Sequence, residues 1–361
     1  MKRMTRVALI TSGGDCQGLN AAIRGVGKAL FQRVDNLEIY GMYDGYRGLI
    51  ESDYKFMEPR DFSGILTEGG TILGTSRQRY IPGKDIVDDE GNSVIPKMLD
   101  TYNRLGLDCL VVMGGNGTQK SAKLLMDAGM NVVTLPKTID NDIWGTDTTF
   151  GFQSAVDIAT NVIDYLHTTA CSHGRIFVVE LMGRDAGWLT LHAGIGSGAD
   201  VILIPEIPYD LKKVAEMLKL RRKRGSGFSI IACAEGAVAI DDVKLDEEAS
   251  RRKREASRHS TVSYAIAEEL ERLTGQDTRV TVPGHYQRGG PPCPYDRVLA
   301  TRFGAYAADL IIKKQYGRMV AIQHGEIVSI PLEDAASKTK FLPTDHPMIQ
   351  MARDIGICMG D

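Results

Sequence analysis

The stretch VVMGGNGTQKSAKLL, residues 111–125, decides the fold class of this chain. Its apolar start predicts a buried strand, and its last residues carry apolar side chains at helical spacing. The glycines between these parts allow a tight turn whose backbone N–H groups can bind a phosphate. A strand, a glycine turn and a helix in this order indicate a βαβ unit. Asn116, however, stands where a carboxylate would be the obvious ligand for a phosphate-bound cation.

The same alternation of strand and helix runs along most of the chain. Strands are predicted at residues 7–10, 107–113, 132–135, 176–182, 201–205, 229–234 and 280–282. Residues 20–31 and 119–130 carry apolar side chains at helical spacing and are predicted to be helices. The pattern predicts an α/β fold of two Rossmann-like lobes with mostly parallel sheets. An active-site cleft is expected between the lobes, at the carboxyl ends of the strands.

The composition limits the classes of function. With 361 residues, of which 43% are hydrophobic and 25% charged, the chain is long enough for two domains with cores. The net charge of −3 gives no reason to expect a nucleic acid or a membrane as partner. The six scattered cysteines form no CxxC pair. Reduced thiols of a cytoplasmic protein are therefore expected.

Two further turns carry residues suited to chemistry. The sequence TSGGD, residues 11–15, places a second glycine turn directly after a strand, which favours a nucleotide site. The sequence LPKTIDND, residues 135–142, supplies a cation, a hydroxyl group and two carboxylates at a strand end. Asp140 could act as general base and Asp142 could bind a metal. A turn with capping aspartates is the alternative interpretation.

Cationic side chains recur at turns in the second half of the chain. They are Arg175, Arg184, Arg279, His285 and Arg288. An arginine fork binds phosphate oxygens in pairs, although any one of these residues could equally form a surface ion pair. Together they favour a sugar phosphate bound by the second lobe. With a polyphosphate in the first lobe, the layout is typical of a kinase.

Eight motifs, in this order, give the chain a family resemblance: TSGGD, YDGYRGL, GGTILGTSR, GGNGT, TIDND, GTDTTFGF, VVELMGR and GHYQRGG. They resemble 6-phosphofructokinase over about residues 5–323, whereas the last forty or so residues match weakly. The resemblance implies an enzyme of glycolysis that uses Mg²⁺. Such enzymes transfer a phosphoryl group to the 1-hydroxyl of fructose 6-phosphate and give fructose 1,6-bisphosphate.

The resemblance also implies roles for single residues. Asp140 would be the general base, with Thr138 beside it on the sugar, and Arg184 would stabilise charge on the transferred group. The fructose 6-phosphate site would comprise Thr138, Asp140, Arg175, Met182, Gly183, Arg184, Glu235, Arg279, His285 and Arg288. The donor site would comprise Gly14, Tyr43, Arg77, Gln78, Gly115, Asn116, Gly117 and Thr118.

The lobes and the assembly are likewise expected from the family. Residues 1–150 with about 285–313 would form the donor lobe. Residues 151–284 with about 314–361 would form the sugar lobe. Family members lend two arginines, here Arg175 and Arg279, to the site of a neighbouring subunit. A homotetramer is therefore expected.

The phosphoryl donor depends on two positions. Pyrophosphate-dependent members of the family have an aspartate in place of Gly117, which fills the space of an α-phosphate. Gly117 leaves that space open and favours ATP, whereas Lys137 is typical of pyrophosphate users. The steric effect is expected to dominate, so ATP is predicted and pyrophosphate is the alternative.

The metal site and the regulatory site depart from the family pattern. Asn116 replaces the usual aspartate, so Mg²⁺ is expected to depend more on donor oxygens and on Asp142. Arg24 and Asp200 match the bacterial effector site, but His167 and residues 225–227 replace the usual arginine and lysine. Control by ADP and phosphoenolpyruvate is therefore not expected. The charged residues 241–258 are interpreted as an exposed insertion, with a regulatory role as the alternative.

Other functions remain open from the sequence. A lipid or NAD kinase would share the GGDGT-like turn. Such kinases lack the motifs of the second lobe that this chain carries. A catalytically silent, sugar-phosphate-binding regulatory subunit should have lost Asp140 or Arg184, and both are present. The ATP-dependent enzyme is the favoured hypothesis.

Overall fold

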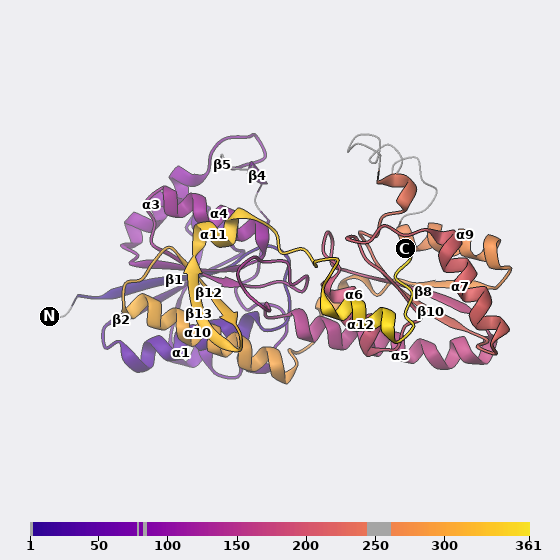
Figure 1. Cartoon of the computed structure of the whole chain (residues 1–361). Coiled ribbons are helices and arrows are strands. Elements are labelled where there is room, and N and C mark those ends of the chain that lie inside the picture. Colours follow the sequence, from indigo (N-terminus) through magenta and orange to yellow (C-terminus); the bar gives the residue numbers. More distant parts are fainter. Residues whose placement is uncertain (1–2, 78, 82–84, 244–260) are drawn as a thin grey trace. The chain divides into compact units, whose positions relative to one another are not determined.

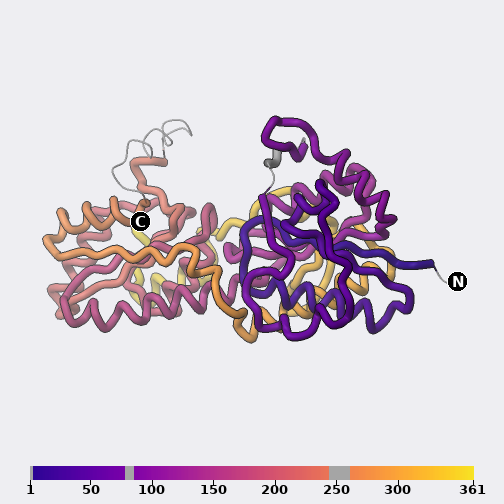
Figure 2. The backbone as a smooth tube through the Cα atoms, turned by 180° about the vertical axis from the view of Figure 1, so that it is seen from behind, coloured from indigo at the N-terminus to yellow at the C-terminus, as the bar shows by residue number. Residues whose placement is uncertain are grey.

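The chain folds into two compact units, each made of two separate stretches of sequence. The computed structural model describes residues 3–77, 79–81, 85–243 and 261–361. Unit 1 comprises Met1–Ser154 and Arg288–Lys340, and unit 2 comprises Ala155–Gln287 and Phe341–Asp361. Figure 2 shows the last stretch of chain (yellow) passing through unit 1 and then into unit 2, where the C-terminus lies.

Unit 1 is built on a mixed sheet of seven strands in the order β13-β12-β7-β6-β1-β2-β3. The strands are β1 (Thr5–Thr11), β2 (Leu37–Met42), β3 (Tyr54–Met57), β6 (Cys109–Gly114), β7 (Val132–Pro136), β12 (Arg318–Gln323) and β13 (Glu326–Pro331). The five central strands are parallel, and the edge strands β3 and β13 are antiparallel to their neighbours. A separate antiparallel pair is formed by β4 (Arg79–Ile81) and β5 (Asp85–Val87).

Helices cover both faces of this sheet (Figure 1). They are α1 (Leu19–Arg33), α2 (Tyr46–Glu51), α3 (Ile95–Leu105), α4 (Asn116–Asp127), α10 (Pro294–Ile312) and α11 (Leu332–Ser337), with the short 3-10 helices η1 (Pro59–Phe62) and η2 (Ile65–Thr67). The pair α1 and α10 lies on one face, and α3, α4 and α11 lie on the other. Because successive strand residues point to opposite faces, Ala8, Ile10, Leu110 and Val112 pack toward α3 and α4.

Unit 2 is built on four parallel strands in the order β11-β8-β10-β9. Its elements are β8 (Ile176–Leu181), α6 (Trp188–Gly196), β9 (Val201–Leu203), α7 (Leu211–Lys223), β10 (Ser229–Ala234), η3 (Ile240–Asp242), α9 (Val262–Thr274), β11 (Thr278–Thr281), η4 (Gly284–Arg288) and α12 (Pro347–Asp354). The long helix α5 (Phe152–His173) begins at the end of the first stretch of unit 1 and continues in unit 2.

The core of unit 2 explains its strand sequences. Ile176, Val178, Ile231 and Cys233 are fully buried and pack against α7 and α9. The strands β8 and β10 are buried along their whole length, as expected for parallel strands covered on both faces.

The predicted fold class, an α/β fold with mostly parallel sheets, is confirmed. Residues 314–340 differ from the expectation, because β12 pairs with β7 and so belongs to unit 1 rather than to the sugar lobe. Of the charged insertion, residues 244–258 lie outside the described residues. Among the helices that the structure describes, none is long and apolar enough to span a membrane.

Candidate active site

Three turns meet at one edge of the sheet of unit 1. The strands β1, β6 and β7 are parallel neighbours, with Thr11 beside Met113 and Gly114 beside Pro136. Their carboxyl ends therefore lie at the same edge, and the turns that follow carry the motifs TSGGD, GGNGT and TIDND. The structure thus brings the three predicted motifs of the first lobe together.

The turn after β6 leads directly into α4, whose N-cap is Gly115. A Cβ on Gly114 would lie 2.3 Å from the side chain of Thr118, so only glycine fits there. At Gly117, in contrast, a Cβ would have no heavy atom of the described residues within 4 Å. The Nε2 of Gln119, in the first turn of α4, donates to the Gly114 carbonyl at 3.0 Å and so holds the turn against the helix. The N-terminus of α4 therefore has open space at Gly117, where backbone N–H groups favour an anion.

The turn after β1 lies against this one. Gly13 has a left-handed φ of 84°, and its N–H donates to the Ser76 carbonyl at 3.1 Å. The buried ammonium of Lys137 donates to the Gly14 carbonyl, and burial lowers the pKa of this lysine. The guanidinium of Arg288 lies 3.2 Å from the position of a Cβ on Gly14. Arg288, expected in the sugar site, is thus beside a predicted donor residue within unit 1.

The remaining predicted donor residues lie at the same edge or outside the described residues. Tyr43 follows β2, the neighbour of β1, and is half-buried. Arg77 is exposed and follows Ser76, which contacts the TSGG turn. Gln78 lies outside the described residues.

The turn after β7 holds the predicted base. The backbone N–H of Asp140 donates to the Thr138 hydroxyl at 3.1 Å, and the Thr149 hydroxyl donates to the Thr138 carbonyl at 2.7 Å. Asn141 has a left-handed φ of 53°, and its Oδ1 accepts from the Thr149 N–H at 3.2 Å. These contacts leave Asp140 half-buried on a backbone that is fixed on both sides.

Asn116 and Asp142, the predicted metal ligands, are in direct contact. The Nδ2 of Asn116 donates to Oδ2 of Asp142 at 2.9 Å and to its carbonyl at 3.0 Å. The Oδ1 of Asn116 is buried and has no hydrogen-bond partner among the residues that the structure describes. Within the described residues, no group of three His, Cys, Asp or Glu side chains is arranged to hold a metal. An acceptor oxygen without a partner beside a carboxylate suits a hard cation such as Mg²⁺.

In unit 2, the predicted sugar residues gather at the carboxyl edge of the sheet. Met182, Gly183 and Arg184 follow β8, Glu235 follows β10, and His285 lies in η4 after β11. The backbone N–H of Arg184 donates to Oε1 of Glu235 at 2.9 Å. Arg184 has a left-handed φ of 52°, and its side chain is 83% exposed. Gln287 accepts from the Met182 N–H at 3.3 Å and joins the η4 turn to the β8 turn.

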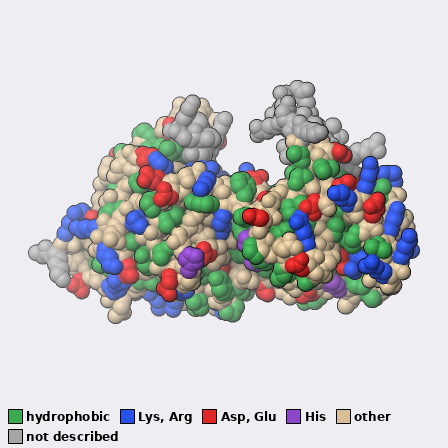
Figure 3. Space-filling model, in the orientation of Figure 1, with side chains coloured by type: hydrophobic (Ala, Val, Ile, Leu, Met, Phe, Trp, Pro, Cys, Tyr) green, Lys and Arg blue, Asp and Glu red, His purple; other side chains and the backbone are tan. Residues whose placement is uncertain are grey.

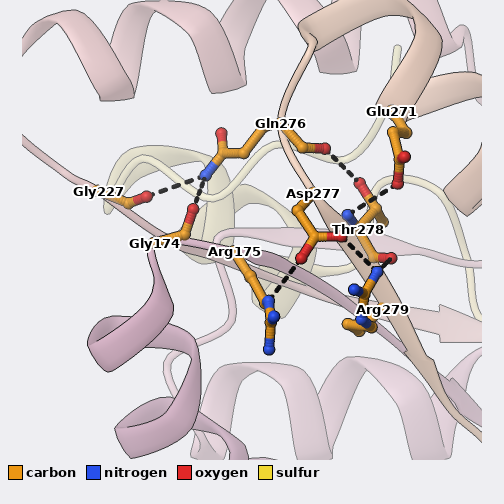
Figure 4. Close-up of polar contacts among 8 residues, drawn as sticks. All are labelled: Gly174, Arg175, Gly227, Glu271, Gln276, Asp277, Thr278 and Arg279. Atoms are coloured by element: carbon orange, nitrogen blue, oxygen red, sulfur yellow. Dashed lines mark hydrogen bonds and ion pairs between the residues drawn. The ribbon is translucent and has the colours of Figure 1, made fainter.

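Arg175 and Arg279 lie at the opposite edge of the same sheet. Arg175 precedes β8 and Arg279 is the second residue of β11, so both mark amino ends of strands. Figure 4 shows Asp277 between them. Its Oδ2 accepts from Nε of Arg175 at 2.6 Å, and its Oδ1 accepts from Nη1 of Arg279. One carboxylate therefore holds both arginines.

Two residues at positions of the effector site, Asp200 and His167, are engaged within unit 2. Arg221 of α7 pairs with Asp200 at 2.5 Å, and burial raises the pKa of Asp200. Nε2 of His167 lies 2.8 Å from the Ser197 carbonyl. Figure 3 shows Lys and Arg side chains gathered at the end of unit 2 that carries α7. Arg24, which also matches the effector site, lies in α1 of unit 1.

Asp277 and Lys340 were not predicted as site residues from the sequence. Asp277 had a local signal, because it stands two positions before Arg279. Lys340 had none, since its backbone N–H donates to the carbonyl of Asp142, far away in sequence, at 2.7 Å.

Glycine turns and a carboxylate turn at one edge of a set of parallel strands are the arrangement expected of an α/β phosphotransferase. Residues 6–311 match the model of the phosphofructokinase family, and the chain belongs to that family. It is 55% identical to the ATP-dependent 6-phosphofructokinase of Spirochaeta thermophila, over 98% of this chain and 97% of the relative. The enzyme of the same name from Propionibacterium freudenreichii is 48% identical, over 99% of both chains.

A solved structure of the same family also matches this chain. Pichia pastoris phosphofructokinase in the T-state matches with a TM-score of 0.79 and 33% identity. The match covers 93% of this chain and 36% of that chain, so this chain spans about a third of the length of the yeast subunit. The family resemblance predicted from the motifs is confirmed.

Proposed function

We propose that this chain is an ATP-dependent 6-phosphofructokinase of glycolysis. It transfers the γ-phosphoryl group of ATP to the 1-hydroxyl of fructose 6-phosphate and releases ADP and fructose 1,6-bisphosphate. The observation that carries the proposal is the junction of the β6 and β7 turns in unit 1. There the Lys137 N–H donates to the Gly114 carbonyl at 3.1 Å and sets the turn of Asp140 beside the open space at Gly117.

The proposed chemistry assigns separate tasks to the two units. Asp140 accepts the proton of the 1-hydroxyl as the oxygen attacks phosphorus, and Thr138 holds the backbone N–H of Asp140. Arg184 of unit 2 neutralises the charge that develops on the transferred group. Its backbone is held by Glu235, which leaves the guanidinium exposed for this purpose.

The donor is proposed to be ATP because of the open space at Gly117. An aspartate there would add a negative charge where an α-phosphate needs room. Lys137 does not distinguish ATP from pyrophosphate, because its ammonium donates to the Gly14 carbonyl at the base of the turn. Pyrophosphate is the alternative donor.

Mg²⁺ is proposed to bind at Asn116 and Asp142. The buried Oδ1 of Asn116 accepts no hydrogen bond from the described part of the chain. Together with the neighbouring carboxylate of Asp142, it fits a hard cation. When bound, the ion would neutralise charge on the donor phosphates. The side-chain amide of Asn116 donates to the carboxylate of Asp142 and so holds it in place even without a cation. An aspartate at position 116 would instead repel that carboxylate.

The sugar site is proposed to form between two copies of the chain. Met182, Gly183, Glu235 and His285 lie at the carboxyl edge of the unit 2 sheet, whereas Arg175 and Arg279 lie at the amino edge. The strand β8 has 6 residues, which at about 3.3 Å each separates the edges by roughly 20 Å. A neighbouring copy would therefore supply the two arginines, and we propose a homotetramer in the cytoplasm. The free thiols of the six cysteines fit that compartment.

The test is one assay of the purified chain with fructose 6-phosphate and Mg²⁺, comparing ATP with pyrophosphate. Formation of fructose 1,6-bisphosphate is followed through aldolase. Faster turnover with pyrophosphate would overturn the proposed donor, and no product with either donor would overturn the proposed reaction. Sugar binding without turnover would indicate a silent regulatory subunit.

A further inference from the structure

The last part of unit 1 packs on the turn that carries the proposed base. Thr339 forms an antiparallel bridge with Ile143, and the Lys340 N–H donates to the Asp142 carbonyl at 2.7 Å. The Thr339 hydroxyl also lies 3.3 Å from Nδ2 of Asn116. This segment lies beyond residue 311, where the match to the family model ends.

The ammonium of Lys340 extends into the loop that follows the base. Its Nζ donates to Oδ1 of Asn141 at 2.9 Å, to the Thr146 carbonyl at 2.9 Å and to the Asp147 carbonyl at 3.0 Å. Three acceptors match the three N–H bonds of an ammonium group. Hydrogen bonds from a charged donor are about twice as strong as neutral ones. The ammonium of Lys340 therefore links both ends of the loop 141–147 through hydrogen bonds.

The same loop is tied back to the base turn. Oδ1 of Asn141 accepts from both Lys340 and the Thr149 N–H, and the Thr149 hydroxyl donates to the Thr138 carbonyl. Asn141 stands between Asp140 and Asp142 with a left-handed backbone. The orientation of its side chain therefore helps to set the backbone on which both carboxylates stand.

Holding an ammonium group in this place is unfavourable unless it is hydrogen-bonded. Burial lowers the pKa of Lys340 to about 8, while the carboxylates of Asp142 and Asp147 act in the opposite direction. Removing the ammonium would leave the Asn141 oxygen and two carbonyls without this donor. The arrangement gives the loop one defined geometry.

We propose that Lys340 is a positioning residue for phosphoryl transfer: it holds the turn 138–142 so that Asp140 and Asp142 present their carboxylates in one arrangement before the substrates bind. This inference rests on the proposed function, since it concerns the same turn. A displacement of about 1 Å at a reacting group costs as much as 100-fold in rate. The loss should therefore appear in kcat rather than in the affinity for fructose 6-phosphate.

The test compares Lys340→Met with Lys313→Met, a matched change of an exposed lysine in unit 1. We expect kcat of Lys340→Met to fall by about 10- to 100-fold. KM for fructose 6-phosphate and its Kd by calorimetry should change by less than about threefold, and Lys340→Arg should recover part of kcat. If Lys340→Met does not fold, Lys340→Gln, which keeps two donors without the charge, takes its place.

The possible results are distinct. A kcat within about twofold of Lys313→Met, or a fall in kcat matched by an equal loss of correctly folded, sugar-binding protein, would overturn the positioning role. A wild-type chain without turnover would instead overturn the proposed function, because the inference concerns only the ratio of variant to wild type.

Discussion

The turns of unit 1 and the arginines of unit 2 are held in different ways. In unit 1, Gln119, Asn141 and Thr149 are buried side chains that donate to or accept from backbone groups. In unit 2, the side chains of Arg184 and Arg279 are 83% and 50% exposed, and their ion pairs are with neighbouring carboxylates. Unit 1 presents a backbone held by buried hydrogen bonds, whereas unit 2 presents exposed charge.

This difference predicts what substitutions should do. Buried hydrogen bonds fix a geometry before any ligand arrives, so changes in unit 1 should act on the rate of the chemical step. Exposed ion pairs contribute little to stability and are easily replaced by a ligand phosphate, so changes at the ion pairs of Arg175 and Arg279 should act on substrate affinity.

The largest effect is expected at the base. Asp140→Ala should lower kcat by about 10²- to 10⁴-fold, because no other group would accept the hydroxyl proton. Binding of fructose 6-phosphate, measured by calorimetry, should persist. Asp127→Ala removes an exposed carboxylate of α4 and is the matched control. Retained turnover in Asp140→Ala would mean that the base lies elsewhere.

Gly117 allows the donor to be tested by size and by charge. Gly117→Asp should lower kcat/KM for ATP by about 100-fold, since a full charge repulsion near a phosphate is worth a few kcal/mol. Gly117→Ala adds only a Cβ in open space and should keep most of the activity. The two variants are compared in initial-rate assays with ATP and with pyrophosphate. Equal losses of activity in Gly117→Asp and Gly117→Ala would show that charge at position 117 does not affect donor binding.

Asp277 tests the other half of the comparison. Asp277→Asn keeps the shape but weakens the hold on Arg175 and Arg279, so KM for fructose 6-phosphate should rise by about tenfold with little change in kcat. Asp164→Asn, at an exposed position of α5, is the control. A fall in kcat at unchanged KM would place these arginines outside substrate binding.

Asn116→Asp should have opposite effects with and without metal. Restoring the carboxylate should strengthen Mg²⁺ binding by about tenfold, or 1.4 kcal/mol. Without Mg²⁺, however, two carboxylates would face each other where an amide now donates to Asp142, so the Tm should fall. Both are read from thermal unfolding at several Mg²⁺ concentrations, with Asn103→Asp on the surface of α3 as control. Identical Tm shifts with and without Mg²⁺ would argue against a metal at this position.

The smallest effect is expected from phosphoenolpyruvate. Because Asp200 is engaged by Arg221 and His167 by the Ser197 carbonyl, millimolar phosphoenolpyruvate should leave the initial rate unchanged. Strong inhibition at that concentration would reveal an effector site that these residues do not describe.

Local sequence patterns predicted those parts of the site that depend on neighbours along the chain. The apolar runs that became β1, β6 and β7 and the glycines after them were recognised because strand period and turn chemistry are local properties. The helix predicted at residues 119–130 begins at Asn116, since the glycine turn itself supplies its first residues. A short-range pattern was enough for these elements.

Contacts between distant residues could not be predicted in this way. The pairing of β12 with β7 places residues 314–340 in unit 1. The sequence of neither strand indicates which other strand it pairs with. Lys340 is one of many lysines, and its acceptors are mostly backbone carbonyls that any sequence would provide. The ion pair of Asp200 with Arg221 was missed for the same reason.

The position of β12 and β13 in the chain has a consequence for synthesis on the ribosome. All four strands of the unit 2 sheet have been made by Thr281, whereas the unit 1 sheet lacks two of its seven strands until Pro331. During that interval the edge of β7 has no neighbour, and an open strand edge is a template for pairing with other chains. The nascent protein therefore carries its aggregation-prone surface in the unit that is begun first and finished later.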